Sequence, residues 1–151
     1  MSTGINKNGN VPLYAGVALQ NTQLVTLGGI AASRNQYVFV VPSTSIEGVK
    51  SVKINDIALV SDTATSGSDG SNKFTFQIAN LTQSKNLLAT AKTTYGAEIT
   101  GDTPYSMTPT QYNSNLAFGD VIELQITKTG SPTDLTNAVI ALSIQWEWEV
   151  V

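Results

Sequence analysis

Short apolar runs alternate with turn-forming residues along most of this chain, a pattern that predicts strands rather than helices. The clearest run lies near the end, where one face carries Ile140, Leu142, Ile144, Trp146, Trp148 and Val150. An unbroken period of two is typical of a half-buried strand. A register slip of one residue would bury Glu147 and Glu149 and expose both indoles, so burial fixes the register.

Further strands are predicted at residues 13–19, 24–30, 37–41, 49–54, 57–60, 74–79, 87–92 and 121–128. Gly28-Gly29 suggests a bulge or bend. Tyr37–Val41 is apolar on both faces and stops at Pro42, so we expect it to be a central strand covered on both sides. Asn55-Asp56 lies between two strand patterns and predicts a hairpin turn. Ser84 could cap a short helix over 87–92, but the Thr-rich residues that follow favour an extended segment.

Turn chemistry separates these strands. Ser61–Asn72 has no apolar period and is predicted to be a loop, and 96–115 is expected to be mostly loop around a short strand. Gly119-Asp120 and Gly130–Asp134 predict turns. The whole pattern predicts an all-β, two-layer antiparallel β-sandwich with a jelly-roll-like topology. We expect a single sandwich domain over 13–151, preceded by a flexible polar arm over 1–12.

Composition supports the β prediction and limits the chemistry. Ser, Thr, Asn and Gln account for 53 of the 151 residues, whereas 13% are charged, a mixture suited to strands and turns. The sequence has no Cys and no His, which excludes thiolate nucleophiles, imidazole bases and the usual zinc sites. We therefore expect no enzyme activity, no catalytic residues, no cofactor and no metal.

Charge and hydropathy bear on possible partners. The net charge of −3 disfavours nucleic acid, whose phosphates attract basic surfaces. No apolar run is long enough to span a membrane, and the first ten residues lack the apolar segment of a secretory signal. We expect neither nucleic acid nor a membrane as a partner.

Two sets of carboxylates are candidate sites. Glu147 and Glu149 share a strand face, at a spacing compatible with a glycosidase pair, but the solvent face of a terminal strand explains them better. Asp62 and Asp69 could line a calcium loop. Asp is also a common turn residue, and the sequence leaves open whether this loop binds an ion.

Hydroxyl and amide motifs are weaker candidates. Ser51 beside Lys50 and Lys53, or Ser84 beside Lys85, could suggest a Ser-Lys dyad, but adjacent strand residues point to opposite faces. Asn80-Leu81-Thr82 is a formal glycosylation motif, which we expect to be incidental.

Aromatic residues and the single arginine complete the candidates. Trp146, Trp148, Tyr95, Tyr105 and Tyr112 could form a sugar-stacking platform, although the strand period favours burial of both indoles. Arg34 is expected in a loop. It could anchor a partner carboxylate, but a solvated charge is the simpler interpretation.

The second half resembles a known group of proteins. The segments that carry the resemblance are Phe74–Leu81, Asn86–Thr90, Leu116–Leu124, Thr129–Pro132 and the final alternating strand. They resemble small jelly-roll decoration, cement or head-fibre proteins of tailed bacteriophages. This resemblance implies a virion protein at the capsid surface, made in the host cytoplasm and frequently trimeric, with the major capsid protein and copies of itself as partners. It supplies no catalytic residue.

We therefore expect a non-enzymatic protein that binds and stabilises an assembled capsid lattice. The alternative from another class is a carbohydrate-binding or host-receptor-binding module, lectin-like or part of a tail fibre, using Tyr95, Tyr105 and Tyr112.

Overall fold

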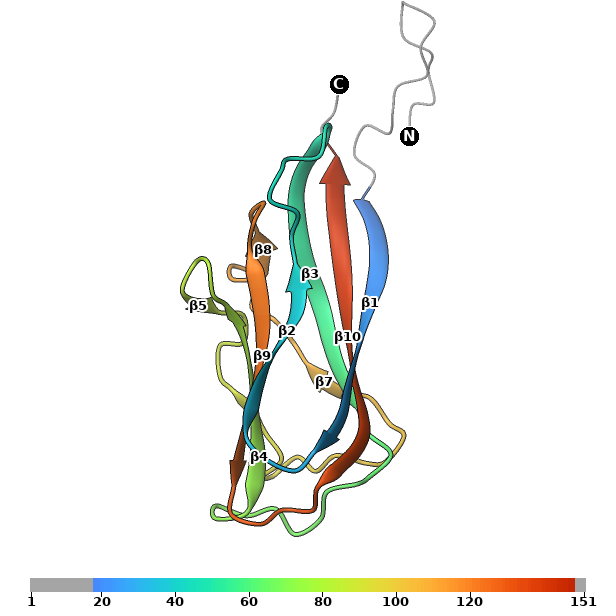
Figure 1. Ribbon diagram of the computed structural model, residues 1–151, viewed down its shortest axis with the longest axis vertical. Helices are drawn as coiled ribbons and strands as arrows, with labels where there is room; N and C mark the ends of the chain where they lie inside the picture. Colours follow the sequence, from blue (N-terminus) through green and yellow to red (C-terminus); the bar gives the residue numbers. More distant parts are fainter. Residues whose placement is uncertain (1–17, 149–151) are drawn as a thin grey trace, which may run out of the picture.

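A computed structural model describes residues 18–148, which form two antiparallel sheets packed face to face (Figure 1). The first sheet contains β1 (Ala18–Ile30), β10 (Leu135–Trp148), β3 (Val49–Val60), β7 (Tyr105–Met107) and β8 (Asn115–Leu116). The second sheet contains β2 (Arg34–Val40), β9 (Val121–Thr129), β4 (Lys73–Asn80), β5 (Lys85–Asn86) and β6 (Lys92–Thr93). The predicted all-β, two-layer antiparallel sandwich is confirmed.

The strands pair as in a jelly roll. The first strand β1 pairs with the last strand β10, and the second strand β2 pairs with β9. Further in, β3 pairs with β7 and β8, and β4 pairs with β5 and β6. The chain therefore folds as one long hairpin whose paired arms are rolled into two sheets. None of the described residues forms a helix that could cross a membrane. The expected arm over 1–12, and its boundary at residue 13, lie outside the described residues.

The core lies between the inner faces of the two sheets. β10 contributes Ile140, Leu142 and Ile144, and β4 contributes Phe74, Phe76 and Ile78, all fully buried. The rings of Phe74 and Phe76 stack with centroids 6.1 Å apart, and Tyr105 meets Phe76 edge-on at 6.0 Å. The period-two patterns at 74–79, 121–128 and 140–148 predicted these faces correctly.

A bulge replaces the hairpin predicted at Asn55-Asp56. Ile54 and Ile57 are both fully buried, although residues three apart lie on opposite faces of a regular strand. The register with β10 shifts here: Ser143 pairs with Asp56, whereas Ile144 pairs with Ile54. Asn55 is thus the extra residue, and it returns the buried face to the core. The hairpin prediction was wrong, because 49–60 is one continuous strand.

The strand at Tyr37–Val41 also differs from its prediction. Residues 37–40 belong to β2, which lies at the edge of the second sheet and pairs with β9 alone among the described strands. Val38 is buried, but Tyr37 is 64% exposed and Val40 is 55% exposed. An apolar run on both faces did not mean burial on both faces here.

Two smaller predictions need correction. The strands expected at 13–19 and 24–30 meet in one strand, β1, with residues 13–17 outside the described part; the predicted bulge at Gly28 is confirmed by register shifts on both sides of it. The segment 87–92 is neither a helix nor one strand. Residues 87–91 form an irregular connection from β5 to the short strand β6, which begins at Lys92. The loops at 61–72 and 130–134 are confirmed.

Candidate interaction surface

Glu147 of the proposed carboxylate pair has a structural role. Register places it opposite Ser51, whose hydroxyl donates a hydrogen bond of 2.8 Å to the carboxylate. The Gln145 amide donates a second bond of 3.2 Å to it. Glu147 therefore joins β3 to β10 on the outer face of the first sheet. Glu149 lies outside the described residues.

The two aspartates of the 61–72 loop bind different neighbours. Asp69 accepts hydrogen bonds from the backbone N–H groups of Ser71 and Asn72, at 2.6 and 2.7 Å, and these bonds lower the pKa of the carboxyl group. Asp62 instead accepts a bond from the Asn137 amide. Within 18–148, no group of three or more acidic, His or Cys side chains is placed to hold a metal ion.

The proposed Ser-Lys pairs do not form. The Ser51 hydroxyl is bonded to Glu147 rather than to Lys50 or Lys53. The Lys85 ammonium group donates to the carbonyl oxygen of Asn115 at 3.2 Å, while Ser84 occupies a turn with φ of 51°. Neither serine bonds to the lysine amine that a Ser-Lys dyad requires.

The glycosylation motif lies at a buried site. Asn80 is fully buried, and its amide donates to the carboxylate of Asp120 at 2.7 Å. Asp120 is itself 1% exposed and also accepts bonds from the Gln83 amide and, at 2.8 Å, from the Ala117 N–H. The motif therefore supports the turn that leads into β9, and its asparagine is inaccessible in the folded chain.

The aromatic candidates do not form one platform. Trp146 and Trp148 are partly buried against the core, and the Trp146 indole N–H donates to Asn21 at 3.0 Å. Tyr105 is buried, and its hydroxyl donates to the Thr93 carbonyl oxygen at 2.7 Å. Tyr95 and Tyr112 are 56% and 84% exposed. Only these two of the five are more than half exposed.

Arg34 is the first residue of β2 rather than part of a loop. Its guanidinium donates to the Leu27 carbonyl oxygen of β1, so it holds two strands of the same molecule together. Gln36 adds a bond of 3.3 Å to the Thr26 carbonyl oxygen. The two side chains fasten β2 to the second half of β1.

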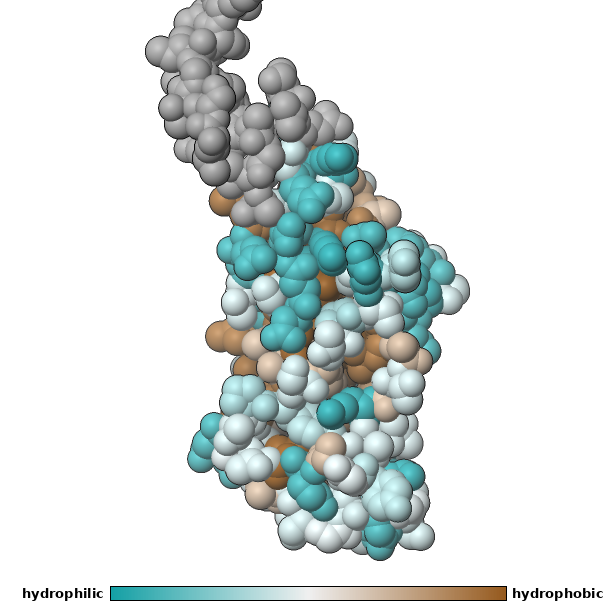
Figure 2. Space-filling model, turned by 180° about the vertical axis from the view of Figure 1, so that it is seen from behind, coloured by the Kyte–Doolittle hydropathy of each residue, from teal (hydrophilic) through white to brown (hydrophobic). Residues whose placement is uncertain are grey.

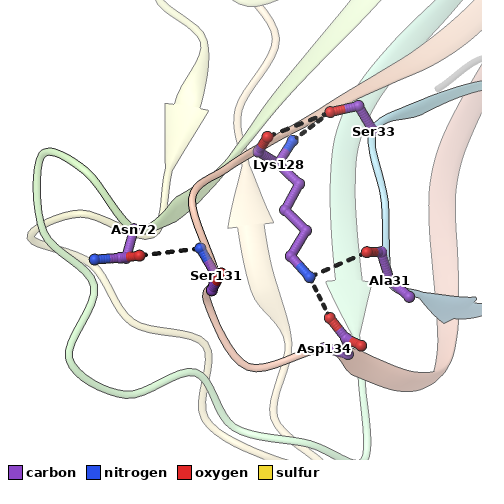
Figure 3. Close-up of polar contacts among 6 residues, drawn as sticks. All are labelled: Ala31, Ser33, Asn72, Lys128, Ser131 and Asp134. Carbon is purple, nitrogen blue, oxygen red and sulfur yellow. Dashed lines mark hydrogen bonds and ion pairs between the residues drawn. The ribbon is translucent and has the colours of Figure 1, made fainter.

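A polar cluster closes the end of the sandwich where β1 turns into β2 (Figure 3). Lys128 of β9 donates to the Ala31 carbonyl oxygen at 3.0 Å and forms an ion pair with Asp134, while the Ser33 hydroxyl bonds the Lys128 backbone. In the same cluster, the Ser131 N–H donates to the Asn72 side chain at 3.0 Å. These contacts join the β1–β2 turn, the β9–β10 turn and the 61–72 loop, and they hold this end of the sandwich together.

The strongest surface feature is apolar. Hydrophobic side chains reach the surface in several separate places on the face that Figure 2 shows. On the second sheet, Val40 pairs with Val121, and the N–H of Leu81 donates to the Val121 carbonyl oxygen at 2.9 Å, which places Leu81 beside this pair. The register between β2 and β9 shifts between Tyr37 and Phe39, which leaves Val38 as the extra residue of a bulge. Tyr37 therefore lies on the same outer face of β2 as Val40. We call this surface the outer patch: Tyr37, Val40, Leu81 and Val121.

A nearly buried carboxylate borders the outer patch. Glu123 pairs with Tyr37 on one side and with Ala79 on the other, and it is 9% exposed. The Gln125 amide donates to it at 3.0 Å. The sequence pattern missed this surface because it predicted that the strand containing Tyr37 and Val40 would be covered on both faces. The Pro that follows this run is as compatible with an edge strand as with a central one.

Comparisons with known proteins add little. No protein-family model matches the chain, and no curated protein matches it. A crystal structure of FLHE aligns with 90% of this chain and 99% of its own, with 11% identity and a TM-score of 0.32. A TM-score this low does not establish a shared fold.

Proposed function

We propose that this protein is a non-enzymatic component of a bacteriophage virion, a decoration or cement protein that binds the assembled major capsid lattice. The observation that carries the proposal is the outer patch, where Tyr37, Val40 and Leu81 are 64%, 55% and 40% exposed on one sheet face. Contiguous exposed apolar side chains on a folded domain mark interaction surfaces. The resemblance of the second half to jelly-roll capsid proteins supplies the partner.

The carboxylates support a binding role over a catalytic one. Glu147, Asp62, Asp69 and Asp120 each accept hydrogen bonds from neighbouring side chains or backbone groups that build the fold. A general acid or base must instead face a substrate with a free proton position. The hydrogen bonds of these carboxylates stabilise the fold. We therefore place the function on the surface of the sandwich.

Stabilisation would follow from mass action. A protein that binds the assembled shell, and not its separated subunits, stabilises the shell by several kcal/mol per site when its concentration far exceeds its dissociation constant. Many copies on one lattice multiply this effect. We place the docking contact at the outer patch, where burial of apolar side chains supplies the free energy.

The test compares two variants of the full chain on shells that lack this protein. Replacing Tyr37 and Val40 together by Ser removes the most exposed part of the outer patch, and we expect binding to shells to weaken about tenfold or more. The matched control is Tyr112→Ser, which removes an 84% exposed tyrosine from the turn between β7 and β8 of the other sheet and should bind normally.

Two measurements report the result: cosedimentation with shells, and the temperature at which the shells rupture. Both variants should melt within a few degrees of wild type, because surface substitutions seldom change stability by more than about 0.5 kcal/mol. Equal rupture temperatures with and without wild-type protein would refute the proposed function. Equal binding by the two variants would move the contact away from the outer patch.

A further inference from the structure

Within residues 18–148, the first half of β1 forms an open sheet edge. Among the described strands, β1 pairs with β10 alone, so one side of its backbone has no strand partner. The edges on the opposite side of the sandwich, β5, β6, β7 and β8, contain two or three residues each. At 13 residues, β1 is long enough to receive another strand. Exposed edges of this length are sites where other chains add by main-chain hydrogen bonds.

The first half of this edge lacks the usual protection against pairing, because the bulge at Gly28 lies in the second half. Folded proteins guard edges with charged residues or proline, and β1 contains neither. No charged residue occurs between Lys7 and Arg34. Leu19 and Leu24 are 54% and 64% exposed, so the edge also presents apolar side chains.

The structure limits where a partner strand can lie. The Thr26 and Leu27 carbonyl oxygens already accept bonds from Gln36 and Arg34. Residues Ala18–Val25 make no such bonds with β2. Within them, Thr22 is the midpoint of Leu19–Val25. Within it, the Gln23 amide makes a long contact of 3.4 Å with the Leu24 carbonyl oxygen, which an incoming N–H would replace.

We infer that this segment pairs with the same segment of a second copy, antiparallel, about a two-fold axis at Thr22. Such an axis pairs Leu19 with Val25, Gln20 with Leu24, and Asn21 with Gln23. Two-fold contacts are self-complementary, and this one brings no like charges together. The pairing joins two first sheets into one continuous sheet across the dimer.

The inference concerns self-association and not capsid binding. It rests on the proposed function only in expecting that copies of this protein bind one another. The contact inferred here gives a dimer in place of the trimer that the resemblance implies. The experiment uses purified protein without shells, so its failure and the failure of the capsid proposal are distinguishable.

The chain has no cysteine, which allows a clean cross-linking test. In Thr22→Cys, the new thiols of two copies lie directly opposite each other, within about 5.5 Å between Cβ atoms, which is near the separation a disulfide spans. We expect mild oxidation to convert this variant largely to a covalent dimer. The matched control is Ser106→Cys, on the exposed edge strand β7 of the same sheet, and it should remain mostly uncross-linked.

Sedimentation of the wild type and of Thr22→Lys supplies a second measurement. The wild type should have twice the chain mass of 16.0 kDa, and Thr22→Lys, which places two cations face to face, should have the monomer mass with an unchanged circular dichroism spectrum. Amide hydrogens within Leu19–Val25 should exchange faster in Thr22→Lys.

Several outcomes would overturn the inference. These are a monomeric or trimeric wild type, equal cross-linking of the two cysteine variants, and a folded Thr22→Lys protein that is still dimeric. If Thr22→Lys loses shell binding while the mass of the wild type is that of a monomer, the edge binds the capsid protein instead of a second copy.

Discussion

At the scale of single residues, neutral hydroxyl and amide groups bind the carboxylates that basic side chains bind in many domains. Glu98 illustrates this. Desolvation raises the pKa of its carboxyl group, but bonds from the Thr65 hydroxyl and from the Ser68 N–H and hydroxyl together lower the pKa below its ordinary value. Asp120 is likewise held by Asn80 and Gln83. Within 18–148, one ion pair, Lys128–Asp134, is present.

Tyr105 gives the fold a dependence on alkaline pH. Burial, and then the negative charge of Glu98, raise the pKa of its hydroxyl from 10.0 to about 12. Above pH 10 the unfolded chain releases this proton while the folded chain keeps it, so the free energy of unfolding falls as pH rises. We expect a loss of about 2 kcal/mol between pH 10 and pH 12.

Urea unfolding at several pH values measures this loss. Tyr105→Phe should be less stable at neutral pH, by about 1 kcal/mol for the lost bond to Thr93, but its stability should fall less between pH 10 and pH 12. Tyr112→Phe, at an exposed position, should keep the wild-type slope. An unchanged slope in Tyr105→Phe would show that its hydroxyl is not the responsible group.

At the scale of elements, the sequence predicts strand faces well and strand partners poorly. The alternation in β4, β9 and β10 is set by burial, which acts on each residue separately, so single-sequence patterns capture it. Whether Tyr37 lies in a central or an edge strand depends on residues far away in sequence. The bulge at Asn55 shows the same limit, because Asn-Asp indicates an irregular backbone without stating whether the chain reverses there.

The candidate surface was harder to predict for the same reason. The outer patch joins β2, β9 and the end of β4, and no local pattern shows that these segments are neighbours. The open edge of β1 can be recognised only when the strand order is known. By contrast, the absence of charge in 8–33 can be read directly from the sequence, and it is the signal that could have drawn attention to this strand.

The turn between β9 and β10 depends on a glycine. Gly130 has φ of 64°, and a Cβ atom there would lie 2.1 Å from the Ser71 carbonyl oxygen, too close for any side chain. We expect Gly130→Ala to lower the free energy of unfolding by about 3 kcal/mol or more, through strain and through separation of the 61–72 loop from the turn. Denaturant unfolding measures this.

The matched control is Gly67→Ala. Gly67 has a similar φ of 67°, with nothing within 4 Å of the added Cβ, so its cost should be that of the backbone conformation alone, about 1 kcal/mol. Equal costs at the two positions would mean that the contact between the turn and the Ser71 backbone does not hold this end of the sandwich together.

At the scale of the whole molecule, the proposed contacts are apolar or neutral. The outer patch consists of Tyr37, Val40, Leu81 and Val121, and the β1 edge carries no charge. The net charge of −3 is small for 151 residues. Long-range electrostatic attraction therefore contributes little to either proposed contact. Burial of side chains must supply most of the binding free energy at the outer patch, whereas main-chain hydrogen bonds contribute at the β1 edge.

Binding to shells should therefore depend weakly on salt. Raising the ionic strength from about 0.05 M to about 0.5 M shortens the screening length several-fold, yet we expect the dissociation constant to change by less than about threefold, because few charges meet at the outer patch. Calorimetric titrations at several temperatures should give a negative heat-capacity change, as burial of apolar surface requires. The variant with Ser at positions 37 and 40 should show a smaller change in heat capacity than wild type. A tenfold or greater loss of affinity over this salt range would instead place the contact on charged residues outside the patch, and the outer patch would no longer explain how this sandwich holds its partner.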